Sequence, residues 1–202
     1  MRPDPFDVPA AWYGRDISKK QKLWSYEFNL NEISELENAS KAFSDAGLPL
    51  GLITSDNFPL PNLGEVVKRV QKELRDGIGF TLFRGLPVDR YDQKMLATMF
   101  CGIGSHIGLA RSQNAAGHLL GHVRNIGADL SDPRTRVYQT TARQHFHTDS
   151  TDVVGLLCIN KAKSGGTSLL ASSVTLFNEI VKRRPDLAEE LFSPLARDRR
   201  GE

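Results

Sequence analysis

An apolar stretch at residues 153–159 constrains the fold of this chain more than any other segment. It has the length of a β-strand and polar residues bound it on both sides, which predicts a strand that is buried on both faces. Residues 161–166 contain Gly165 and Gly166 and are expected to form the turn after this strand. Residues 167–171 would then return as a second strand.

A histidine and a carboxylate come shortly before this stretch. If residues 144–149 are extended, alternation places His145, His147 and Asp149 on one face of the chain. An imidazole nitrogen and a carboxylate oxygen can bind one metal ion, and they supply two thirds of the 2-His-1-carboxylate triad of non-haem Fe(II) sites. A His-x-Asp tripeptide is also common as a surface or hydrogen-bonding pair, so the surrounding sequence has to decide its role.

The other histidines carry weaker signals. His118 and His122 have the spacing of the zinc-protease motif H-E-x-x-H, but Leu119 stands where that motif needs Glu, and Gly121 weakens a helix. A zinc hydrolase is therefore a minor alternative. His106 follows the end of a predicted helix, where it is expected to interact with the C-terminal carbonyls.

Helical spacing of apolar residues predicts several helices around these motifs. They are expected at residues 31–46, 65–75, 93–103 after an N-cap at Asp92, and 174–184 after an N-cap at Ser172 or Ser173, with a short helix at 185–192. Residues 79–84 and 119–123 are predicted short strands, and residues 48–61 a surface loop. Residues 1–26 read as an arm that is ordered where its aromatic side chains dock.

Composition excludes several classes of protein. The 202 residues are 40% hydrophobic and carry a formal net charge of +2, which is too weakly basic to indicate a nucleic-acid or anionic-membrane partner. The basic clusters at 182–184 and 197–200 are expected to be solvated. Cys101 and Cys158 are too few for a disulfide framework and are expected to be buried thiols. Without an apolar stretch long enough to span a membrane, the chain is predicted to be soluble and cytoplasmic.

The order of these motifs resembles a known family. His147-Thr148-Asp149, an apolar strand, Gly165-Gly166-Thr167-Ser168 and a serine-capped helix follow one another as in the taurine dioxygenase-like (TauD/TfdA) family. Residues 77–80, 84–87 and 103–108 are similar to the N-terminal half of that family. The resemblance covers residues 60–202.

The resemblance implies an α+β, mainly β fold, with a partial double-stranded β-helix (a jelly roll of the clavaminate synthase-like type) and flanking helices. Residues 1–60 would form an N-terminal arm and helix, and residues 61–202 an incomplete dioxygenase domain. The implied activity is Fe(II)- and 2-oxoglutarate-dependent oxidation, by O2, of a small polar or acidic substrate such as taurine or another sulfonate.

The resemblance also implies roles for individual residues. His147 and Asp149 would bind iron, and Ser168, with Thr167 one position away, would contact the 2-oxoglutarate co-substrate. The candidate substrate pocket is lined by residues in positions that the family often uses for this purpose. These are Gln113, Asn114, Asn125 and His145.

The sequence departs from the family pattern in its last part. The family's second metal-binding His and its co-substrate Arg lie well downstream of the first motif, yet no His follows Asp149 in this sequence. We therefore expect an N-terminal fragment that is inactive as an isolated chain. The alternative is a non-catalytic jelly-roll binding module or a degenerate pseudoenzyme.

Overall fold

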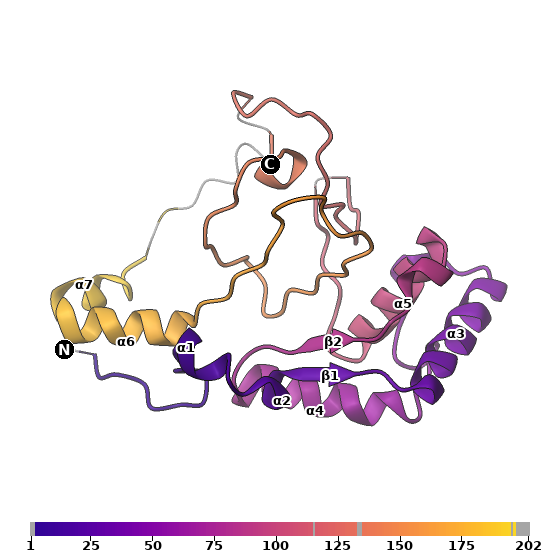
Figure 1. Cartoon of the computed structure of the whole chain (residues 1–202), viewed down its shortest axis with the longest axis horizontal. Helices are drawn as coiled ribbons and strands as arrows, with labels where there is room; N and C mark the ends of the chain where they lie inside the picture. The colour runs from indigo at the N-terminus through magenta and orange to yellow at the C-terminus, as the bar shows by residue number, and fades with distance from the viewer. Residues whose placement is uncertain (1–2, 115, 133–134, 195, 197–202) are drawn as a thin grey trace.

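The computed structural model describes residues 3–114, 116–132, 135–194 and 196, so the predicted tail cluster at 197–200 lies outside the described residues. Three long helices and a short two-stranded sheet form the ordered body, and a long looped segment extends from it (Figure 1). The α-helices and strands are α1 (Gly14–Ile17), α2 (Gln21–Trp24), β1 (Ser25–Glu27), α3 (Leu30–Asp45), α4 (Leu63–Asp76), β2 (Leu82–Arg84), α5 (Gln93–Ser105), α6 (Ser173–Arg183) and α7 (Pro185–Glu190). Short 3-10 turns lie at Leu50–Leu52, Val88–Arg90 and Val137–Gln139.

Helix α3 begins at a complete capping box. The Asn29 side chain accepts hydrogen bonds from the backbone N–H groups of Asn31 and Glu32, and the Glu32 carboxylate accepts one from the Asn29 N–H. The same buried carboxylate accepts a hydrogen bond from the Tyr26 hydroxyl at 2.5 Å. Every charge-bearing oxygen of Glu32 thus has a donor, which allows its burial.

Helix α4 takes its N-terminal cap from another helix. Its own N-cap residue, Asn62, makes no side-chain capping bond. The Glu35 carboxylate of α3 instead accepts from the backbone N–H groups of Asn62 and Leu63, at 2.8 and 2.9 Å. An anion at a helix N-terminus also interacts favourably with the helix dipole, so this contact fixes α4 against α3.

Helix α5 confirms its predicted start and ends two residues later than predicted. Asp92 caps it by accepting from the Met95 N–H, and the helix ends at Ser105. Helix α6 likewise begins after the predicted cap Ser172, which accepts from the Thr175 N–H. These caps placed the starts of α5 and α6 correctly because a cap acts within one helical turn.

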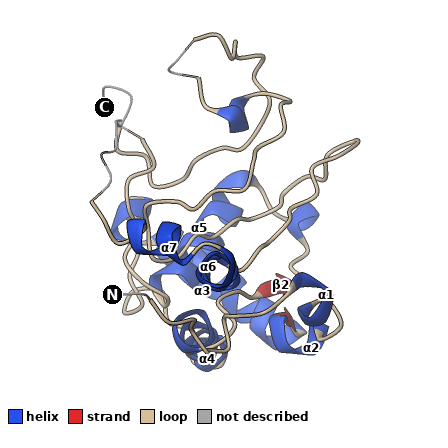
Figure 2. Cartoon of the chain, turned by 90° about the vertical axis from the view of Figure 1, so that its left-hand side faces the viewer, coloured by secondary structure: helices blue, strands red, loops and turns tan. Residues whose placement is uncertain are grey.

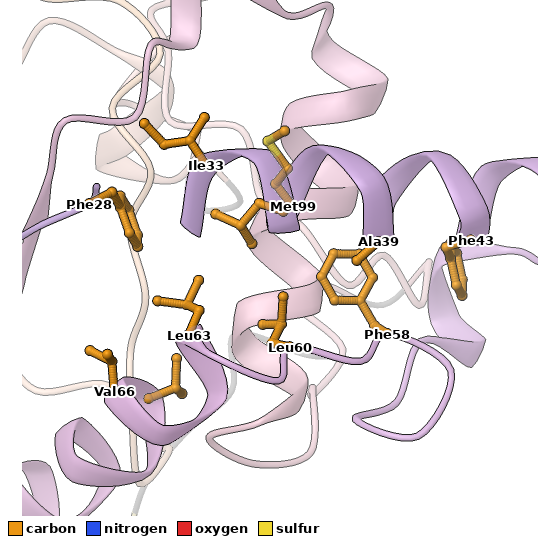
Figure 3. Close-up of a cluster of buried hydrophobic side chains, with 11 residues drawn as sticks. Phe28, Ile33, Ala39, Phe43, Phe58, Leu60, Leu63, Val66 and Met99 are labelled. Carbon is orange, nitrogen blue, oxygen red and sulfur yellow. The ribbon is translucent and has the colours of Figure 1, made fainter. Parts of the chain in front are cut away.

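The core lies where α3, α4, α5 and the loop before α4 meet. Figure 3 shows Phe58 and Leu60 of that loop pointing toward Ala39 and Met99. Phe58, Leu36, Leu63, Val67 and Met99 are fully buried. The fold is therefore centred on helix packing.

The sheet is smaller than the sequence predicted. Strands β1 and β2 are parallel, with Tyr26 opposite Phe83, and the predicted strand at 79–84 is shortened to Leu82–Arg84. The rings of Phe28 and Phe83 stack at 5.2 Å between centroids beside this pair. Tyr26 and Phe83 of these strands pack against the helical core.

The predicted jelly-roll strands do not form within the described part of the chain. Residues 119–123, 153–159 and 167–171 are loop, in the long tan segment of Figure 2, and Leu156 is 76% exposed. Strand structure requires a neighbouring strand to satisfy its backbone N–H and C=O groups, and no described segment lies in register beside residues 153–159. The prediction of a buried strand there is wrong for this structure.

The two cysteines differ in their surroundings. Cys101 is half-buried in α5, and burial raises the pKa of its thiol. Cys158 is exposed, which contradicts the prediction of a core thiol, because the segment that carries it is not packed. Within the described residues, no helix has both the length and the apolar character needed to cross a membrane.

We predict opposite effects for two glycines of α5. A Cβ at Gly102 would overlap the buried Phe58 ring, so Gly102→Ala should lower the free energy of unfolding by about 1–3 kcal/mol despite the higher helix propensity of Ala. A Cβ at Gly104 meets nothing within 4 Å, so Gly104→Ala should raise the free energy of unfolding by up to about 1 kcal/mol. Denaturant unfolding of both variants tests the close approach of Phe58 to α5, and equal effects would contradict it.

We also predict a high-pH transition in the helical unit. Burial and then a hydrogen bond to Glu32 raise the pKa of Tyr26 to about 12, and burial and then a hydrogen bond to Glu37 raise that of Tyr91 to about 12. Because these folded-state values exceed the ordinary value of 10.0, the stability from both groups is complete below pH 10 and is lost as pH rises toward 12. Tyrosinate absorbance during alkaline titration should show a late component that Tyr26→Phe and Tyr91→Phe each reduce. Titration of all tyrosines together near pH 10 would contradict this assignment.

Candidate metal half-site

His147 and Asp149 face each other at the surface. His147 Nε2 lies 3.8 Å from Asp149 Oδ1, and both side chains are about half exposed, at 49% and 53%. Two donors that each lie about 2.1 Å from one ion are separated by about 3.0 Å in adjacent positions and about 4.2 Å in opposite positions. The observed separation therefore falls within the span that a single ion can bridge.

The hydrogen bonds of His147 define its neutral tautomer. His147 Nδ1 lies 2.8 Å from the backbone oxygen of His145, and because a carbonyl can only accept, Nδ1 carries the proton. Nε2 is left with its lone pair, on the side toward Asp149. A backbone carbonyl that holds the distal N–H is the usual support of a metal-binding histidine.

Gln144 is a neighbour that the alternation pattern did not predict. Its side-chain Nε2 lies 3.1 Å from His147 Nε2 and donates to that lone pair. Residues three apart meet here because the backbone bends at Phe146, so the segment does not have the fully extended geometry expected from the sequence. A metal ion would have to displace the Gln144 amide from His147.

The candidate site brings together two possible ligands in the described part of the chain. No group of three His, Cys, Asp or Glu side chains placed to hold a metal occurs among residues 3–114, 116–132, 135–194 and 196. The imidazole and carboxylate fit Fe(II) in chemical type, but they supply fewer ligands than the facial triad requires. We therefore describe His147 and Asp149 as a half-site.

The segment predicted to turn between two strands has bends at Lys163 and Ser164, and its two glycines have left-handed backbone conformations. Gly165 and Gly166 both have φ of +70°, in the left-handed region that favours glycine. Thr167 and Ser168 follow this turn and are exposed. Their hydroxyl groups are therefore accessible to a ligand.

The candidate pocket residues are involved in local turns. Gln113 Nε2 donates to the Arg111 carbonyl, and Asn114 Oδ1 accepts from the His118 N–H at 3.2 Å. Asn125 Oδ1 accepts from the Gly127 N–H at 2.9 Å. Their predicted contact with substrate stays a prediction.

His118 and His122 do not have the helical arrangement of a zinc-protease motif. Residues 118–122 are loop, and each ring has an amide neighbour: Asn114 Nδ2 lies 3.0 Å from His118 Nδ1, and Gln93 Nε2 lies 3.4 Å from His122 Nδ1. His106, which was expected to contact the end of α5, places its Nε2 2.8 Å from the Phe58 carbonyl. It is a structural residue that ties α5 to the core.

Comparison with known proteins identifies the family of this chain. Residues 44–202 match the family described as "Taurine catabolism dioxygenase TauD, TfdA family". The chain belongs to the TauD/TfdA family. Because the match includes the half-site and the Gly-Gly turn, both motifs lie within the family domain.

Three curated proteins illustrate the range of related TauD/TfdA-type sequences. The chain is 31% identical to a taurine hydroxylase-like protein, SAT17, of Stachybotrys chartarum over 90% of its own length and 49% of that protein. It is 27% identical to FR-33289 synthase of Streptomyces rubellomurinus over 98% of its length and 58% of that protein. A shorter match, 33% identical, covers 40% of the chain and 34% of a uridine-5'-phosphate dioxygenase of an Amycolatopsis species. The chain thus spans about half the length of the first two relatives.

We predict weak but localised metal binding by this chain. His147→Ala should reduce Fe(II) affinity about tenfold or more in anaerobic equilibrium dialysis, and Asp149→Ala should do the same, because each removes one of two ligands. His145→Ala is the matched control, since it retains the backbone carbonyl that orients His147. An equal loss of metal affinity in His118→Ala or His122→Ala would instead place the metal at these two histidines, as the zinc-hydrolase alternative requires.

Proposed function

We propose that this chain contributes to an Fe(II)- and 2-oxoglutarate-dependent dioxygenase by supplying two of its iron ligands and part of its co-substrate site. The single observation that carries the proposal is the half-site itself. In a member of the TauD/TfdA family, His147 places its Nε2 3.8 Å from Asp149 Oδ1 and its Nδ1 against the His145 carbonyl.

Each residue has a separate task in this proposal. His147 Nε2 and an Asp149 carboxylate oxygen would hold the metal, while the His145 carbonyl keeps the imidazole in the required tautomer. The Ser168 hydroxyl, with that of Thr167 as the neighbouring alternative, would donate a hydrogen bond to a carboxylate of 2-oxoglutarate. Bound iron and 2-oxoglutarate would supply the oxidative chemistry with O2.

We propose that residues 61–202 form one part of a jelly-roll domain and need further strands. Apolar side chains close in sequence to the half-site and the Gly-Gly turn are exposed to solvent, with exposures of 62% for Phe146, 76% for Leu156 and 63% for Leu170. Exposed apolar area of this kind is stabilised when another surface covers it. A complementary set of strands would cover these side chains and could supply the third metal ligand and an Arg for the co-substrate.

The proposed substrate is a small polar or acidic molecule. The names of the relatives refer to taurine hydroxylation and to uridine 5'-phosphate, which both concern molecules with an anionic group. Gln113, Asn114, Asn125 and His145 remain the proposed pocket residues. Amide and imidazole groups can hydrogen-bond an anionic or polar substrate once strand formation redirects them.

A non-catalytic binding module is the second candidate function. It is favoured by one observation, namely that the described residues provide only two metal ligands. In that case the jelly-roll surface would bind a ligand without oxidising it.

We predict that the purified 202-residue chain forms no succinate from 2-oxoglutarate with Fe(II) and O2, because a two-ligand site binds iron weakly. A longer form that continues past Glu202 and carries a downstream His and Arg should form succinate. In that form His147→Ala or Asp149→Ala should abolish succinate production.

Matched serine variants test the co-substrate contact, and measurements of turnover separate the two candidate functions. In the longer form, Ser168→Ala should raise the KM for 2-oxoglutarate more than it lowers kcat, whereas Ser173→Ala, at an exposed position in the first turn of α6, should change neither. Succinate production by the 202-residue chain alone would overturn the prediction of inactivity. A longer form that binds iron without turning over 2-oxoglutarate would support the binding module.

A further inference from the structure

The N-terminal segment forms a hook around the start of α6. We define the hook as residues 6–13, which turn at Val8 through a hydrogen bond from the Ala11 N–H to the Val8 carbonyl. Figure 1 shows this indigo segment running alongside α6, with α1 at the N-terminal end of that helix. The two segments are separated by more than 150 residues in sequence yet share several hydrogen bonds.

Polar side chains on one face of α6 hold the backbone of the hook. Ser172 Oγ donates to the Ala10 carbonyl, and Thr175 Oγ1 donates to the Trp12 carbonyl at 2.7 Å. Positions three apart lie on the same helix face, so both hydroxyls reach the same part of the hook. Asn178, a further three residues along, continues this row.

The Asn178 amide binds both polar groups of one backbone residue. Its Oδ1 accepts from the Phe6 N–H and its Nδ2 donates to the Phe6 carbonyl, each at 2.8 Å. The Phe6 ring also lies 5.2 Å from that of Phe177. Tyr13 completes the contact by donating to Glu179 at 2.7 Å.

The other side of the hook is attached to the helical body. Trp12 Nε1 donates to the Ile78 carbonyl at 2.8 Å, and its ring lies 5.3 Å from that of Phe80 in the segment between α4 and β2. The hook therefore connects α6 with the body. Among the described residues, the side-chain hydrogen bonds that tie α6 to distant parts of the chain all run to residues 6–13.

Ser172 links the hook to the candidate co-substrate residue Ser168. It is buried, it caps α6 by accepting from the Thr175 N–H at 2.9 Å, and it donates to the hook at the same time. Ser168 lies four residues earlier, shortly after the Gly-Gly turn. A fixed Ser172 thus limits the positions that Ser168 can reach.

We propose that residues 6–13 position α6, through Ser172 and Thr175, and thereby hold the end of the co-substrate segment 167–171 against the helical body. Ser172 and Thr175 are positioning residues in this proposal and touch no ligand. The effect on 2-oxoglutarate rests on the proposed function, but the positioning of α6 does not.

The first experiment measures positioning alone. Nitroxide labels at Lys41→Cys of α3 and Lys182→Cys of α6, both exposed, are placed in a chain with Cys101→Ser and Cys158→Ser, and electron–electron distances are recorded. Thr175→Val has the shape of Thr but lacks the donor to the Trp12 carbonyl, while its backbone N–H still donates to Ser172 Oγ. We expect it to broaden the distance distribution about twofold or more.

Matched variants distinguish this effect from loss of helix stability. Thr175→Ser retains the hydroxyl and Ser173→Ala removes an exposed one, so both should leave the distribution unchanged. Asn178→Asp keeps the acceptor for the Phe6 N–H but loses the donor to the Phe6 carbonyl, and should broaden it as Thr175→Val does. Unchanged distributions in both Thr175→Val and Asn178→Asp would overturn the proposal.

The second experiment tests the consequence for the site. In a form that turns over 2-oxoglutarate, Thr175→Val should raise the KM for 2-oxoglutarate several-fold with a smaller change in kcat, and Thr175→Ser should restore it. An unchanged KM together with a broadened distance distribution would remove the co-substrate role from the proposal. Absence of turnover in every form would contradict the proposed function and leave the distance measurements to decide the role of the hook.

Discussion

The fold depends on the way Phe58 holds α5. Its ring is fully buried and lies so close to Gly102 that a Cβ there would overlap it, and its carbonyl lies 2.8 Å from His106 Nε2, one helical turn further on. A carbonyl accepts only, so the imidazole donates through Nε2. One loop residue therefore fixes α5 at two successive turns, through packing and through a hydrogen bond. The loop that carries it leads directly into α4, which is capped in turn by Glu35 of α3.

The predictability of each element from sequence follows the distance over which its stabilising contacts act. Asn29, Asp92 and Ser172 cap their helices within one turn, and these helices were located correctly. The cap of α4 comes from Glu35, 27 residues before Asn62, and no local pattern indicates it. Residues 153–159 have a strand-like composition, yet strand formation requires a neighbouring strand, which composition cannot supply. The strands were wrongly predicted and the α4 cap was missed for the same reason, because both depend on residues distant in sequence.

At the half-site, too, the local contact was predictable from sequence and the contact that depends on distant strands was not. The proximity of His147 and Asp149 is local, because the two residues are two positions apart, and the sequence identified it. The bend that brings Gln144 onto His147 was not predicted, because the expectation of an extended segment assumed strand pairing. Strand pairing would extend residues 144–149 and separate Gln144 from His147, since successive side chains in a strand alternate between faces. Completion of the sheet would therefore also free Nε2 for a metal ion.

The segment between α5 and α6 is held at both ends. At one end Gln71 of α4 donates to the Ile107 carbonyl at 2.7 Å, and at the other the buried Ser172 is held by the hook. The entropy needed to bring the ends of a long loop together is thus already offset by the helical unit and the hook. Additional strands that pair with residues 153–159 and 167–171 would have to order only the interior of this loop. In the proposed enzyme, the helical unit would serve the site by reducing that entropic cost.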